Sequence, residues 1–107
     1  IQYDEITDYT NPVKIEIREV EPEISYLDLI RLKVTDTNNQ NNKEKITYLD
    51  VRYSSRDLNK ILTIDENYLI TRQGDVVEII FDELPILEEG SVREVGVIAK
   101  GYYDRLD

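Results

Sequence analysis

The side chains that could carry chemistry in this chain are mainly carboxylates. The 107-residue sequence contains no His and no Cys, which excludes a Ser-His-Asp triad, a Cys-His dyad, a His proton shuttle and a standard zinc or copper site within the chain. Carboxylate-only catalysis, as in a glycosidase, needs two acids about 5–10 Å apart in a cleft. Acids beside a turn are usually solvated, and a domain of this size rarely forms a deep cleft, so we expect no enzyme activity. The carboxylates concerned lie around Pro85: Asp82, Glu83, Glu88 and Glu89.

A polar tract at residues 36–45 could supply the oxygen ligands that a hard cation such as calcium prefers. It lacks a central glycine and carries only two carboxylates, while Lys43 and Lys45 add opposing charge. It also contains no apolar side chain to hold it against a core. We interpret the tract as a mobile loop and predict no metal site and no cofactor, with calcium binding as the alternative. The alternating oxygen-bearing side chains are Asp36, Asn38, Gln40, Asn42 and Glu44.

Tyrosine is the main aromatic residue, with eight copies against one Phe and no Trp. Tyrosine is enriched at protein interfaces, and its ring can also stack on sugars. We expect Tyr48 and Tyr53 to lie on strand faces, in the core or in cross-strand pairs. Four tyrosines near the chain ends are harder to assign to a core, and we predict that they contact a protein partner: Tyr102, Tyr103, Tyr3 and Tyr9. Packing on terminal strands and sugar binding are the alternatives.

The balance of charge limits the possible partners. Asp and Glu number 23 against 13 Lys and Arg, which gives a net charge of −10. Such a surface repels a phosphate backbone and an anionic bilayer within a Debye length. We therefore expect no nucleic acid and no direct membrane contact, whereas solubility, basic protein partners or cations suit an acidic surface.

The sequence predicts that these residues are carried by β-strands, and the clearest strand pattern occurs within residues 76–99. Val77, Ile79 and Phe81 alternate with polar residues, as do Val95, Val97 and Ala99 after a connection that contains Pro85 and Gly90. This pattern is typical of a chain that crosses between two sheets packed face to face.

The rest of the chain fits the same architecture. Residues 1–11 read as a lead-in that pairs at a sheet edge, residues 26–36 are long enough for a central strand, and residues 46–53 place Leu49, Val51 and Tyr53 inward. Shorter apolar pieces occur at residues 13–19, 60–64 and 68–71, and no stretch of ten residues has a helical period. The sequence predicts one domain, residues 1–107, folded as an immunoglobulin-like antiparallel β-sandwich of about seven strands.

The start of the chain carries a further expectation. No methionine occurs, even at position 1, so we expect that a segment before Ile1 was removed. A secretory signal, a membrane anchor and a neighbouring domain are all open.

Several short segments together carry a resemblance to a known family. They are the strand 29–34 ending in Asp-Thr-Asn, Leu-Asp-Val at 49–51, Gly-Asp-Val-Val-Glu-Ile at 74–79, Leu-Glu-Glu-Gly at 87–90, Val-Gly-Val at 95–97 and the closing Gly101. From Val13 onward the chain resembles the small adhesion-like sandwiches of prokaryotic cell surfaces, in particular the soluble domains of archaellum stator proteins. It departs from that pattern in its Asn-rich insertion at residues 38–42.

The resemblance implies a domain outside the cytoplasm, at the cell surface or in a periplasm-like space. In that family the soluble domain follows one N-terminal membrane helix and binds surface-layer protein or a sister stator subunit without catalysis. No individual binding residue carries over, and the oligomeric state stays open. We therefore expect a non-catalytic protein-interaction domain of a surface or motility appendage. The alternative is a carbohydrate-binding accessory module of a secreted or cell-surface protein.

Overall fold

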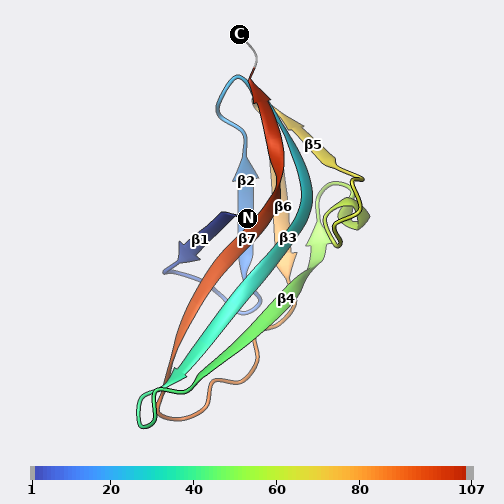
Figure 1. Ribbon diagram of the computed structural model, residues 1–107. Helices are drawn as coiled ribbons and strands as arrows, with labels where there is room; N and C mark the ends of the chain where they lie inside the picture. Colours follow the sequence, from blue (N-terminus) through green and yellow to red (C-terminus); the bar gives the residue numbers. More distant parts are fainter. Residues whose placement is uncertain (1, 106–107) are drawn as a thin grey trace.

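The fold is built from seven antiparallel strands (Figure 1). The structure, a computed structural model, describes residues 2–105 and the side chains of residues 5–105. The prediction of an all-β chain with about seven strands is confirmed, and the only helix in the described residues is a short 3₁₀ turn. The elements are β1 (Gln2–Ile6), β2 (Lys14–Arg18), β3 (Glu23–Asn38), β4 (Glu44–Ser54), η1 (Leu58–Lys60), β5 (Leu69–Arg72), β6 (Val76–Phe81) and β7 (Ser91–Arg105).

Hydrogen bonds join these strands into one curled sheet. The order is β1-β7-β3-β4-β6-β2, and β5 pairs with the first part of β3. The sheet turns at β4, because its residues 44–50 pair with β3 whereas Val51, Tyr53 and Ser54 pair with β6. The molecule is elongated, 52 × 25 × 24 Å, and β3 and β7 run side by side along its length (Figure 1).

The longest strand, β3, is central, as its sequence predicts. It pairs with β7 from Glu23 to Asn38 and with β4 and β5 on its other side. Its register against β7 shifts between Leu27 and Leu29, where Asp28 is the extra residue of a β-bulge. The bulge changes which side chains of β3 face inward, so Leu27 and Ile30 both lie on the concave face.

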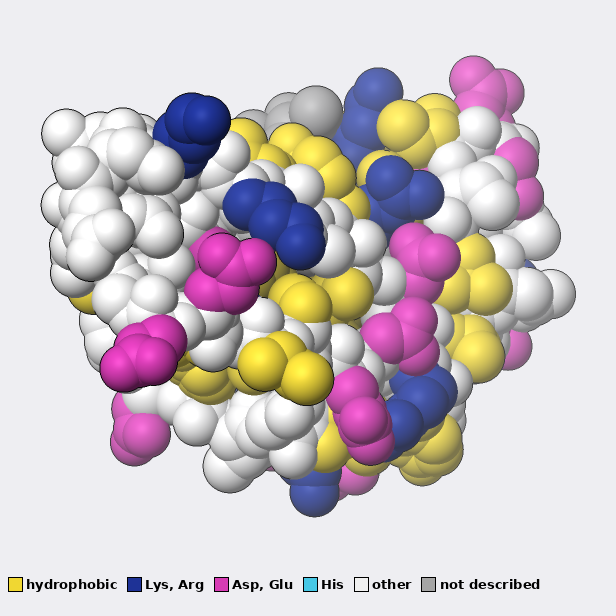
Figure 2. All heavy atoms as spheres, turned by 90° about the horizontal axis from the view of Figure 1, so that it is seen from below, with side chains coloured by type: hydrophobic (Ala, Val, Ile, Leu, Met, Phe, Trp, Pro, Cys, Tyr) yellow, Lys and Arg dark blue, Asp and Glu magenta, His cyan; other side chains and the backbone are white. Residues whose placement is uncertain are grey.

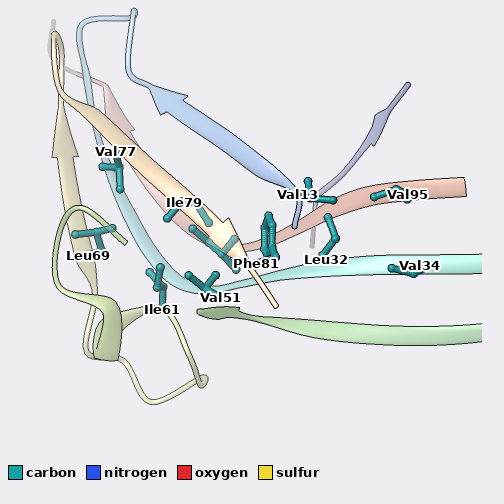
Figure 3. Packing of buried hydrophobic residues seen from close by; sticks show 11 residues of the cluster. Val13, Leu32, Val34, Val51, Ile61, Leu69, Val77, Ile79, Phe81 and Val95 are labelled. Carbon is teal, nitrogen blue, oxygen red and sulfur yellow. The ribbon is translucent and has the colours of Figure 1, made fainter. Parts of the chain in front are cut away.

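The core fills the space between β6 and the β3–β7 pair (Figure 3). Val77, Ile79 and Phe81 of β6 are fully buried, as their alternation predicts, and Ile30 and Leu32 of β3 are buried opposite them. Continuous burial of branched apolar side chains is the main favourable term for a domain of this size. β6 therefore acts as scaffold, and its one polar residue, Glu78, faces outward.

The prediction that Tyr53 faces the core is wrong. Val51 pairs with Phe81 and Tyr53 pairs with Ile80, so Arg52 is an extra residue in β4. A bulge of this kind reverses the inward and outward alternation beyond it. Tyr53 is consequently 47% exposed, and Tyr48, on the convex face of the same strand, is 51% exposed.

The prediction of a loop over residues 36–45 is wrong at both ends. β3 continues to Asn38 and β4 begins at Glu44, so that only residues 39–43 connect them. The connection is closed by hydrogen bonds within it: the Asn38 amide donates to Lys43 O, and the Asn42 amide donates to Asn38 O, both at 2.9 Å. Side-chain oxygens of Asn residues accept from backbone amides two positions on, as in Asx turns.

Residues 60–64, one of the shorter apolar pieces of the sequence, comprise the last residue of η1 and the start of an irregular connection. Only Leu62 forms an isolated bridge there, with Leu29. The buried Asp28 carboxylate holds the next turn, because it accepts the backbone amides of Asp65 and Glu66 at 3.2 and 3.3 Å. This contact fixes the approach of the chain to β5 and thereby the position of Tyr68.

Candidate protein-binding site

Three tyrosine rings gather at the end of the molecule where β7 ends. The rings of Tyr26 and Tyr102 are stacked, with centroids 4.6 Å apart and an interplanar angle of 14°. Tyr68 meets both edge-on, with its centroid 6.1 Å from that of Tyr26 and 5.3 Å from that of Tyr102. Aromatic pairs at these separations add to the stability gained from burial. We refer to Tyr26, Tyr68 and Tyr102 as the tyrosine cluster.

Strand register explains the tyrosine cluster. Tyr26 of β3 lies directly opposite Tyr102 of β7, and directly opposite residues in an antiparallel pair share a face. Tyr68 arrives beside them because β5 pairs with β3, with Leu69 opposite Leu27. The cluster therefore depends on three segments that are far apart in the sequence.

Tyr102 and Tyr103 remain accessible but point to opposite faces of the sheet. Their exposed fractions are 50% and 57%, and successive residues of a strand alternate between faces. Tyr102 lies on the convex side with Tyr26. A shallow hollow of about 530 Å³ runs beside both, and Leu27, Ala99 and Gly101 contribute to its walls.

The other two predicted contact residues are placed differently. Tyr9 is half-buried and packs against the hydrophobic core, and it is not part of the tyrosine cluster at the end of β7. Tyr3 lies in β1, opposite Ile98 of β7, and its side chain is outside the described residues. Sequence reasoning named Tyr102 but missed Tyr26 and Tyr68, which only strand register places beside it.

The carboxylates considered for catalysis are exposed in the connection between β6 and β7. Glu88 borders a small hollow at the β3–β4 hairpin, and the other three line neither that hollow nor the one beside Tyr103. In the tract considered for calcium, both carboxylate oxygens of Asp36 accept from Arg93. Within residues 5–105, no group of three acidic side chains could hold a metal ion.

The surface carries charges of both signs. Figure 2 shows Lys and Arg lying among acidic and hydrophobic side chains on the face turned to the viewer. Among the described residues, no helix is long and apolar enough to cross a bilayer.

Comparisons with known proteins do not assign the chain to a family. Models of protein families, curated proteins and solved structures were all compared with the chain, and none matches it.

Tyr68 is expected to keep its proton beyond pH 10. Desolvation by the neighbouring groups raises the pKa of its hydroxyl above the ordinary 10.0, and Glu66, Tyr102 and Asp28 act in the same direction. A raised pKa in the folded state favours folding below pH 10, and this contribution is lost as the pH rises through the raised value. NMR titration of ring-labelled tyrosines should show a midpoint above 10.0 for Tyr68.

Glu66→Gln should lower that midpoint, because it removes the negative charge with the largest effect on the pKa of Tyr68. Glu89→Gln, an exposed acid in the connection between β6 and β7, is the matched control and should leave it unchanged. A Tyr68 midpoint at or below 10.0 would contradict the described packing of the tyrosine cluster.

Proposed function

We propose that the chain is a non-catalytic protein-interaction domain of immunoglobulin-like type that works outside the cytoplasm. In this proposal it is a stator or anchoring component of a surface or motility appendage and binds surface-layer protein or a sister subunit. The resemblance to archaellum stator domains supports the setting. The tyrosine cluster, with its exposed member Tyr102, and the exposed Tyr103 on the opposite face support the mode of action.

The argument from the tyrosine cluster is one of preorganisation. Stacking on Tyr26 holds the Tyr102 ring in one orientation while half of it stays exposed, so little conformational entropy is lost when a partner covers it. Rigid aromatic anchors of this kind often dominate the energy of an interface.

The same geometry favours a protein partner over a polysaccharide. A flat sugar-binding surface needs two or three rings side by side in one plane. Tyr102 instead lies parallel above Tyr26, and Tyr68 stands nearly perpendicular to both. The carbohydrate-binding alternative therefore has less support from these residues.

Binding of the purified domain to isolated surface-layer protein, and to a second copy of the domain, tests the proposal. Tyr102→Ala and Tyr103→Ala, made separately, should show which face is used. The substitution on the contacted face should weaken binding at least about tenfold, the effect of losing one aromatic anchor. Tyr48→Ala, which removes an equally exposed ring from the convex face of β4, should leave affinity unchanged.

Two results would count against the proposal. One is an affinity that neither Tyr102→Ala nor Tyr103→Ala changes in proteins that remain folded by circular dichroism. The other is saturable binding to purified polysaccharides with no binding to either protein, which would favour the accessory-module alternative.

A further inference from the structure

A further hollow lies on the concave side of the curled sheet, between β2 and the β3–β7 pair. Its volume is about 420 Å³. Its apolar walls come from four strands: Ile6 of β1, Ile15 and Ile17 of β2, Leu27 of β3, and Val97 and Ala99 of β7. It shares Ser25, Leu27 and Ala99 with the hollow beside Tyr103, and we call these two adjacent hollows together the β2–β7 groove.

One edge of the β2–β7 groove is a strand with free backbone groups. Within the described residues, β2 pairs only with β6. Val13 O accepts from the Phe81 amide and the Glu19 amide donates to Asp75 O, so the odd-numbered residues bond toward β6. Because bonding alternates along an antiparallel strand, the N–H and C=O groups of Lys14, Glu16 and Arg18 point to the open side.

A buried hydroxyl in the β2–β7 groove has no partner. Thr71 of β5 is 2% exposed and helps to line the groove. Its Oγ1 makes no hydrogen bond among the described residues. Buried polar side chains are nearly always hydrogen-bonded in folded proteins, so this hydroxyl indicates a polar group that the bound state supplies.

One end of the β2–β7 groove is acidic. Glu19 and Glu23 border it, and the Glu19 carboxylate accepts a hydrogen bond from the Ser25 hydroxyl at 2.5 Å. Desolvation raises the pKa of Glu23, as do the charge of Glu19, a hydrogen bond with the Glu19 side chain and the charge of Glu21, while Arg105 acts in the opposite direction. A cationic side chain from a ligand would complement this end.

We propose that the β2–β7 groove binds an extended segment of a partner protein, which adds a strand to the free edge of β2. Alternate apolar side chains of that segment fill the groove, a polar group reaches Thr71, and a Lys or Arg lies against the acidic end at Glu19 and Glu23. Strand addition of this kind takes affinity from main-chain hydrogen bonds and specificity from side-chain pockets. The inference rests on the proposed function, since it specifies how a partner is held.

A library of random twelve-residue peptides displayed on phage and selected on the immobilised domain tests the inference. The enriched peptides should alternate apolar and polar residues and carry Lys or Arg near one end. Synthetic copies should slow amide exchange at Lys14, Glu16 and Arg18. Methylation of backbone nitrogens at alternate positions of the peptide should reduce affinity at least tenfold, because it blocks pairing with β2.

Two variants of the domain test whether the peptide binds in the β2–β7 groove. Ile17→Lys should abolish binding by filling the groove. Thr71→Val keeps the shape of the side chain but removes its hydroxyl, so it should weaken binding several-fold without lowering the midpoint of thermal unfolding. The Thr71→Val result keeps the test decisive if Ile17→Lys fails to fold.

Several outcomes would overturn the inference. The first is a selection in which peptides are enriched no more on the wild-type domain than on the Ile17→Lys protein. The second is a set of peptides whose affinity is unchanged by Thr71→Val. The third is a dimer of the domain that Ile17→Lys dissociates, since a second copy would then be the occupant of the groove. If Ile17→Lys leaves surface-layer binding intact but Tyr102→Ala or Tyr103→Ala abolishes it, strand addition is refuted and the proposed function still holds. Peptide binding without surface-layer binding would refute only the proposed function.

Discussion

Replacing Asp36 by alanine is expected to lower the free energy of unfolding by about 3–5 kcal/mol, the cost of leaving a buried charge without its partner. Asp36 Oδ1 and Oδ2 accept from Arg93 Nε and Nη2 at 2.7 and 2.9 Å. The side chains are 14% and 8% exposed. Arg93 Nη2 also donates to Pro85 O at 2.7 Å. The Asp36–Arg93 pair therefore holds the connection between β6 and β7 against the sheet. Urea denaturation measures the effect.

Asp50→Ala is the matched control. Asp50 also pairs with an arginine of a neighbouring strand, Arg31, but the two side chains are 56% and 42% exposed. Exposed pairs contribute about 0–1 kcal/mol. The double replacement Asp36→Leu/Arg93→Met removes both charges and should cost less than either single change to alanine. Equal losses for Asp36→Ala and Asp50→Ala would contradict the buried pair.

Gly101→Ala is expected to destabilise the domain by about 3 kcal/mol, at the upper end of the cost of overpacking. A Cβ at this position would lie 2.0 Å from Tyr26 O and 3.1 Å from Leu27 Cα. These are backbone atoms of β3, so β3 and β7 would have to separate beside the Asp28 bulge. The loss should appear in urea denaturation.

The same substitution should disturb the tyrosine cluster, because Gly101 precedes Tyr102 and faces Leu27. The near-ultraviolet circular dichroism of the tyrosines should therefore weaken in native Gly101→Ala protein. Lys100→Ala, one residue earlier on an exposed position of the same strand, should change stability by less than about 0.5 kcal/mol. A Gly101→Ala protein as stable as the wild type would show that β3 and β7 are not so closely apposed.

Local alternation predicted much of the fold. The buried face of β6 and the central position of β3 follow from Val77, Ile79 and Phe81 and from the length of an apolar strand. These features depend on side-chain periodicity alone. The hydrogen-bond order, in which β4 joins β3 to β6, depends on long-range pairing that periodicity does not encode.

The wrong predictions for Tyr53 and for residues 36–38 have a common physical cause. Tyr53 faces solvent because of an extra residue in β4, and a single insertion reverses the face of every later side chain. Residues 36–38 are strand rather than loop because they pair with residues 91–93 of β7, and Asp36 is held by Arg93. Both depend on a partner strand that composition does not identify.

The candidate site was predictable only in part. The aromatic bias and the position of Tyr102 near the chain end pointed to it. Its neighbours Tyr26 and Tyr68 join it through the register of β3 against β7 and β5. The β2–β7 groove depends likewise on a strand edge and on Thr71, and neither has a signal in the sequence.

Hydrogen–deuterium exchange of the domain bound to surface-layer protein shows which residues the partner covers. Binding at the tyrosine cluster should slow amide exchange in the first part of β3 and the last part of β7, at residues 23–27 and 100–105. Exchange in the connection at residues 39–43 should be unaffected. Protection confined to residues 39–43 and the adjoining ends of β3 and β4 would contradict the account.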